Sequence, residues 1–96
     1  MATYNVVRTK HATLLATVVD TVNLSGSFGF VRVVNRSALG SVFVRVDGTD
    51  PVVSADETFS VDNNSEKEIP IPNTAAIQVR LVCSAAAAYS VEGIGN

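Results

Sequence analysis

Hydrophobic and polar residues alternate along most of this chain with a period of two. In residues 41–46, for example, three valines share one side, and Phe43 and Arg45 share the other. Successive side chains of a β-strand point to opposite faces of a sheet, so this period predicts strands. No segment shows a 3.6-residue period over the length of a typical helix. The pattern therefore predicts an all-β chain.

Turn-forming residues divide the chain into short segments that each fit one strand. Residues 28–35 are apolar on both faces except at Arg32, which favours a central position in a sheet. A five-residue connection ending in Gly40 follows, so we expect residues 28–35 and 41–46 to form a hairpin. The prolines at 70 and 72 cannot donate to a ladder, which places residues 65–71 at an edge. The other expected strands cover residues 13–24, as one strand or as two with a bend, and residues 58–61, 75–84 and 89–92.

These segments predict an antiparallel β-sandwich of seven to eight short strands, with a small closed β-barrel as the alternative. Seventeen Val, four Ile and eight Thr agree with it, because β-branched side chains fit a pleated sheet. Ninety-six residues suffice for one small domain with one core. We assign this domain to residues 13–96, preceded by residues 1–12 as an N-terminal arm or added strand.

Composition narrows the classes of function. Hydrophobic residues make up 47% of the chain and charged residues 17%, which favours a folded domain over a disordered one. The net charge of −2 argues against nucleic-acid binding, which relies on dense Lys and Arg patches. We expect no signal peptide and no membrane helix, because no apolar stretch is long enough or suitably placed. Synthesis in a cytoplasm is therefore expected.

The residues that most often carry chemistry are few. One Cys and one His cannot supply a Cys/His metal cluster or a disulfide within the chain. His11 lies in the N-terminal segment, and Cys83 fits a small buried hydrophobe. We therefore predict no catalytic residues, no cofactor and no metal site, and a protein that is not an enzyme. Most acidic residues are interpreted as solvated turn formers, namely Asp47, Asp50, Asp56, Glu57 and Asp62.

Two groups of residues are candidate partner contacts. Residues 2–10 have the pattern of an extra strand, which pairs either with the home sheet or with the sheet of a neighbouring subunit. The third alternative is that these residues are disordered. Its candidate contacts are Tyr4, Val6, Arg8 and Lys10. Arg32 and Arg45 form the second group, because the expected hairpin would bring these like charges close together. They face either an acidic surface on a partner subunit or the acids of adjacent strands, Asp20, Glu57 or Glu92.

Several stretches, taken in order, resemble small virion proteins of tailed bacteriophages. The stretches are residues 33–37 leading to Gly40, Val-Arg-Val-Asp-Gly-Thr-Asp-Pro at 44–51, Ile-Pro-Ile-Pro at 69–72, and Ala-Ala-Tyr-Ser-Val-Glu-Gly at 87–93. The resemblance covers residues 13–95 and includes no active-site residues. It implies a β-sandwich that assembles on the particle.

The resemblance and the missing catalytic set together favour a capsid decoration protein. Such a protein would stabilise the assembled head by bridging capsid subunits, because weak contacts add up over many symmetric copies. Its partners would be the major capsid protein or other virion subunits, with copies forming a homo-oligomer on the particle. The alternatives are a minor tail or head–tail connector component, or a displayed carbohydrate- or receptor-binding module. Six aromatic residues and no Trp count against sugar binding.

Overall fold

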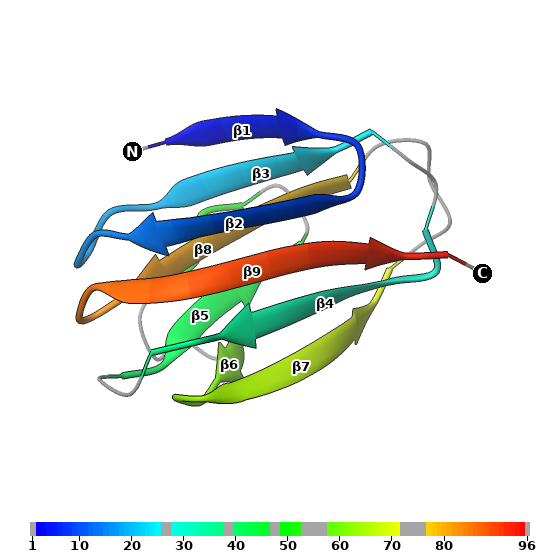
Figure 1. Cartoon of the computed structure of the whole chain (residues 1–96). Helices are drawn as coiled ribbons and strands as arrows, with labels where there is room; N and C mark the ends of the chain where they lie inside the picture. Colours follow the sequence, from blue (N-terminus) through cyan, green and yellow to red (C-terminus); the bar gives the residue numbers. More distant parts are fainter. Residues whose placement is uncertain are drawn as a thin grey trace.

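The computed structural model describes residues 2–25, 28–37, 40–46, 49–52, 58–71 and 77–95. These residues form two packed β-sheets and contain no helix (Figure 1). The described strands are β1 (Thr3–Val6), β2 (Thr9–Leu14), β3 (Asp20–Leu24), β4 (Phe30–Asn35), β5 (Val42–Arg45), β6 (Phe59–Val61), β7 (Ser65–Pro70), β8 (Ile77–Cys83) and β9 (Ala87–Ile94). The predicted β-sandwich is confirmed, and the N-terminal segment supplies two of its strands.

The two sheets differ in size and in strand order. The five-stranded sheet has the order β1-β3-β8-β5-β6, and the four-stranded sheet has the order β2-β9-β4-β7. Every described pair is antiparallel except β1 and β3, which run parallel with Thr3 opposite Thr21. Strand β4 is central and β7 lies at an edge, as the apolar pattern of one and the prolines of the other predicted.

The N-terminal segment passes from one sheet to the other. Its first half, β1, pairs with β3, and its second half, β2, pairs with β9. The bend between them lies at Val7 and Arg8, where the amide of Gly93 donates to the Arg8 carbonyl at 2.8 Å. Of the three expected arrangements for this segment, the structure shows pairing with the chain's own sheets. Residues 13–24 likewise divide between two strands, with a turn that holds Thr17 at a φ of 60°.

The core fills the space between the sheets with the inward-facing residues of both. Strand β8 contributes Ile77, Val79, Leu81 and Cys83, all buried, as their shared face predicted. Cys83 is a buried free cysteine within this core, which agrees with its interpretation as a small hydrophobe. Since apolar burial stabilises a protein by roughly 25 cal/mol per Å², this layer of Val, Leu and Ile is the main source of stability.

The expected hairpin of residues 28–35 and 41–46 is wrong. Strand β4 belongs to the four-stranded sheet and β5 to the five-stranded sheet, so the connection crosses between layers. Asn35 explains this crossing, because its fully buried amide donates to the carbonyl of Gly40 at 2.7 Å and to that of Val61 at 3.1 Å. Its Oδ1 accepts the amide of Ser37 at 3.0 Å. A satisfied buried amide at the end of β4 fixes the chain where it leaves the sheet.

Candidate functional site

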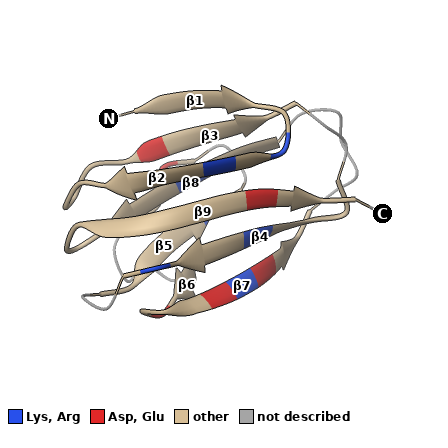
Figure 2. Ribbon diagram, in the orientation of Figure 1, with Lys and Arg blue, Asp and Glu red and all other residues tan. Residues whose placement is uncertain are grey.

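A cluster of one arginine and three glutamates extends over three strands of the four-stranded sheet. Figure 2 shows acidic segments of β7 and β9 on either side of a basic segment of β4. Arg32 of β4 lies opposite Glu68 of β7 and Glu92 of β9, and Glu66 lies two residues before Glu68 on β7. Its guanidinium is 2.8 Å from Glu68, 3.1 Å from Glu66 and 3.5 Å from Glu92. The hydrogen bond to Glu68, with the negative charges of all three acids, raises the pKa of Arg32. The cluster keeps a formal excess of two negative charges.

The second candidate arginine lies on the other sheet. Arg45 of β5 faces Arg80 of β8 in the five-stranded sheet, so Arg32 and Arg45 do not meet as expected. The reason is the crossing between layers at the end of β4. Of the three acids expected near these arginines, Glu92 contacts Arg32, Asp20 is buried in the interior, and Glu57 lies outside the described residues.

A chain of polar side chains runs across the outer face of the five-stranded sheet. Asn23 donates to Asn5 at 2.9 Å, and Gln78 donates to Asn23 at 3.1 Å. Arg80 then donates to Gln78 at 2.8 Å and forms an ion pair with Asp50. Because side-chain amides carry both donors and acceptors, each member satisfies the next. This face is therefore polar and ordered from β1 to β8.

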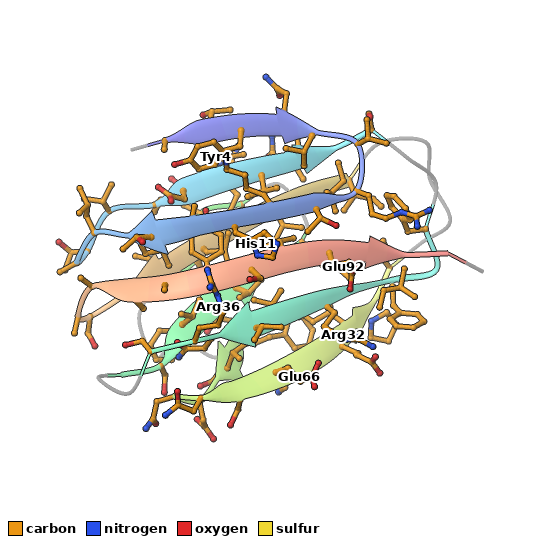
Figure 3. All side chains as sticks on the ribbon, in the orientation of Figure 1. Tyr4, His11, Arg32, Arg36, Glu66 and Glu92 are labelled. Atoms are coloured by element: carbon orange, nitrogen blue, oxygen red, sulfur yellow. The ribbon has the colours of Figure 1, made fainter. Side chains whose placement is uncertain are left out.

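The four candidate contacts of the N-terminal segment lie in different surroundings, and Figure 3 labels the first of them, Tyr4 on β1. Tyr4 and Val6 on β1 are half-buried and pack against the core. The Lys10 ammonium lies 4.2 Å from the centre of the Tyr4 ring. The Arg8 guanidinium lies 5.8 Å from the centre of the Phe28 ring. These are distances typical of cation–π contacts. Of these four side chains, that of Arg8 is exposed, whereas those of Tyr4, Val6 and Lys10 are half-buried.

Both strands of the N-terminal segment lie at sheet edges. Strand β1 ends the five-stranded sheet and β2 ends the four-stranded sheet, so each pairs on one side only among the described strands. The bend between them exposes Val7 by 71%, and the far end of β2 exposes Leu15 by 64%. Unpaired edges beside exposed apolar side chains are a common place for another chain to bind.

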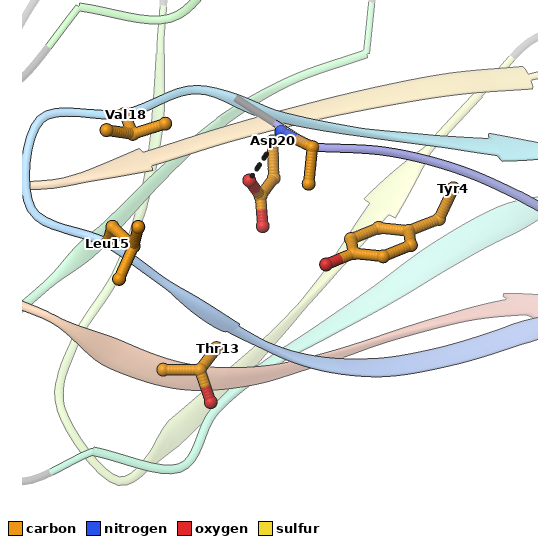
Figure 4. Close-up of a pocket in the computed structure, with 6 residues that line it drawn as sticks. Tyr4, Thr13, Leu15, Val18 and Asp20 are labelled. Atoms are coloured by element: carbon orange, nitrogen blue, oxygen red, sulfur yellow. Dashed lines mark hydrogen bonds between the residues drawn. The ribbon is translucent and has the colours of Figure 1, made fainter.

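A pocket of about 370 Å³ opens between the two sheets at this same side (Figure 4). Its lining residues are Ala2, Tyr4, Thr13, Leu15, Val18 and Asp20. Asp20 is only 4% exposed, and its carboxylate accepts hydrogen bonds from the Tyr89 hydroxyl at 3.0 Å and from the Ala2 amide at 3.3 Å. Burial, followed by the charge of Asp20, raises the pKa of Tyr89. Asp20 therefore forms the polar base of a mostly apolar recess.

The sequence predicted Asp20 only as one alternative partner of Arg32 or Arg45, and not as part of a pocket. A signal was present, because Asp20 falls on the same face of its strand as Val22 and Leu24. An acid on an apolar face is buried only where other groups hydrogen-bond to it. The partner that decides its role, Tyr89, is 69 residues away and cannot be found from local pattern.

One histidine and one serine lie close enough together to be considered as a base and a nucleophile. His11 Nδ1 and Ser90 Oγ lie 2.6 Å apart on β2 and β9. A catalytic pair also needs a third group that orients the base, and no described residue hydrogen-bonds to the other ring nitrogen of His11. Within the described ranges there is also no group of three His, Cys, Asp or Glu residues placed to hold a metal ion.

Comparisons with known proteins do not assign this chain to a family. A scan against protein-family models and a search of curated proteins both find no match. In the part of the chain that the structure describes, no helix is long and apolar enough to cross a membrane.

Proposed function

We propose that this chain is a capsid decoration protein of a tailed bacteriophage, a non-enzymatic subunit that binds the assembled head and bridges neighbouring capsid subunits. The sequence resemblance to small virion proteins supports this assignment over most of the chain. The β-sandwich is the fold that the resemblance implies.

The observation that carries the proposal is the open side of the sandwich formed by β1 and β2. Two strand edges, one from each sheet, lie together there and have no described partner strand beyond them. Val7 and Leu15 add exposed apolar surface at the bend and at the end of β2. A strand or loop of a neighbouring subunit would bind these edges through main-chain hydrogen bonds.

A decoration protein would stabilise the head through weak contacts that are repeated over a symmetric shell. A subunit that binds only the assembled head shifts the equilibrium towards that head by mass action. Each contact is modest, but a subunit that bridges two neighbours gains affinity through the high local concentration of its second site. No chemical step is required of such a protein.

The copy number of the protein in purified phage particles tests the proposal. Quantitative mass spectrometry against the major capsid protein should give hundreds of copies per particle. A few to dozens of copies would overturn decoration and place the protein in the tail or the head–tail connector. Absence from the particle would overturn the virion assignment and favour a free binding module.

A further inference from the structure

From the pocket beside Asp20 we infer a binding site for a primary alkylammonium ion, which goes beyond the proposed function and does not depend on it. The pocket combines a buried carboxylate, a tyrosine hydroxyl and an apolar wall. Its volume of about 370 Å³ falls within the range of small-ligand sites.

The base of the pocket selects for positive charge. Asp20 accepts two hydrogen bonds, from Tyr89 and from Ala2, and has no ion-pair partner among the described residues. A carboxylate has about four acceptor positions, so further positions remain for a donor in the pocket. Because a buried charge is costly without an opposite charge, a cation in the pocket is favoured over a neutral or anionic group.

The other lining residues fit the shape of an ammonium group on an alkyl chain. Figure 4 shows the Asp20 carboxylate and the Tyr4 hydroxyl pointing into the same space, whereas the hydroxyl of Thr13 points away from them. An ammonium group has three donors and no acceptor, which suits the oxygen atoms of Asp20 and Tyr4, from two separate strands. Leu15 and Val18 supply the apolar wall along which an alkyl chain of four or five carbons lies.

The chain already places one ammonium group next to this pocket. The Lys10 ammonium lies 4.2 Å from the centre of the Tyr4 ring, at the aromatic wall. This contact shows that the ring of Tyr4 attracts such a group. It also means that Lys10 competes electrostatically with a bound ammonium ion, so removing its charge should strengthen binding.

The test is a titration of the isotope-labelled full chain, followed by NMR, with n-pentylammonium chloride. We expect saturable shifts at the amides of Tyr4, Leu15, Val18 and Asp20. Binding of 1-pentanol, which lacks the charge, should be at least tenfold weaker. Pentyltrimethylammonium, which lacks the N–H donors, should also bind at least tenfold less tightly. Equal binding of 1-pentanol, or no saturable binding of the amine, would overturn the inference.

Variants localise the binding without relying on a buried substitution. Leu15→Arg adds a competing cation at an exposed position and should weaken pentylammonium binding at least fivefold, whereas Val52→Arg, with the same exposure of 64%, should not. Lys10→Met should strengthen it severalfold. Asp20→Asn should abolish it, and the two surface variants decide the matter if that protein does not fold. Unchanged binding in Leu15→Arg would show that the amine binds elsewhere.

The same titration distinguishes two sources of the ammonium group. Nα-acetyl-lysine N-methylamide presents a lysine side chain with its backbone attached. Binding at least as tight as that of n-pentylammonium supports the lysine of a partner protein as the ligand. Binding more than tenfold weaker supports a free alkylamine, since the backbone would then be excluded at the lip formed by Leu15.

Discussion

The hydroxyl of Tyr89 donates a 3.0 Å hydrogen bond to Asp20 Oδ2 across the interior of the sandwich. Tyr89 belongs to the four-stranded sheet and Asp20 to the five-stranded sheet, and both are buried. This contact joins the two layers through polar groups within a core made mostly of Val, Leu and Ile. It also fixes the carboxylate that forms the base of the pocket.

Replacing Tyr89 by Phe should lower the free energy of unfolding by about 1–3 kcal/mol. The substitution keeps the ring but leaves the buried Asp20 carboxylate without its best hydrogen-bond donor. Urea denaturation followed by circular dichroism measures the change. Tyr4→Phe is the matched control, because the Tyr4 hydroxyl has no hydrogen-bond partner among the described residues. Equal losses in both variants would contradict a special role for the Tyr89–Asp20 contact.

The same tyrosine predicts a loss of stability at alkaline pH. The pKa of Tyr89 is raised in the folded chain, mainly by burial, above the value of about 10 for an unfolded tyrosine. The unfolded state therefore releases this proton first, and the stability contributed by Tyr89 is complete below about pH 10. Above that pH it should fall by up to roughly 1.4 kcal/mol per pH unit. Urea titrations between pH 8 and pH 11.5 should show this slope as the difference between wild type and Tyr89→Phe, and parallel curves would contradict it.

Gly93 is required because the ring of Phe28 packs directly on it. A Cβ atom at position 93 would lie 2.5 Å from two ring carbons of Phe28, which is itself buried. Gly93→Ala should therefore destabilise the fold by about 1–3 kcal/mol through overpacking. Gly95→Ala serves as the control, since nothing lies within 4 Å of its Cβ position. Thermal unfolding of the two variants gives the comparison, and a Gly93→Ala protein as stable as the control would show that Phe28 moves aside freely.

Much of the fold was predictable because alternation records which face of a strand is buried. The inward residues of β8 and the edge position of β7 both follow from local pattern. The sheet to which a strand belongs does not, because connection length alone cannot distinguish a hairpin from a crossing between layers. Asn35 decides that question through the carbonyl of Val61, which is 26 residues away.

The candidate site was less predictable for the same physical reason. The contacts of Arg32 with Glu66 and Glu68 depend on the pairing of β4 with β7, which the sequence analysis did not assign. The pocket depends on β1 and β2 lying in different sheets. A bend of two residues, Val7 and Arg8, sets that arrangement without any distinctive motif.

Replacing Arg32 by Gln should destabilise the fold slightly, and more at low salt than at high salt. Without Arg32, three glutamates on adjacent strands repel one another across the exposed face. Salt screens charges at the surface, with a screening length of roughly 10 Å at 0.1 M and 3 Å at 1 M. The melting temperature of Arg32→Gln should therefore lie clearly below that of wild type at about 0.02 M NaCl and close to it at about 1 M NaCl. Arg36→Gln is the control, because Arg36 donates to the backbone carbonyl of Tyr89 and not to a carboxylate. The effect of this variant on the melting temperature should change little with salt.

If the open side of the sandwich binds the capsid, a charge at its bend should block attachment without unfolding the protein. Val7 is 71% exposed between β1 and β2, so Val7→Asp places a carboxylate where a partner strand would lie and removes no core contact. We expect at least a tenfold loss of binding to phage heads that lack this protein, measured by co-sedimentation. Val52→Asp adds the same charge at an exposed valine outside these strands and should bind as wild type does. Equal binding of the two variants would remove β1 and β2 from the interface, because an uncompensated carboxylate buried against a partner weakens binding strongly.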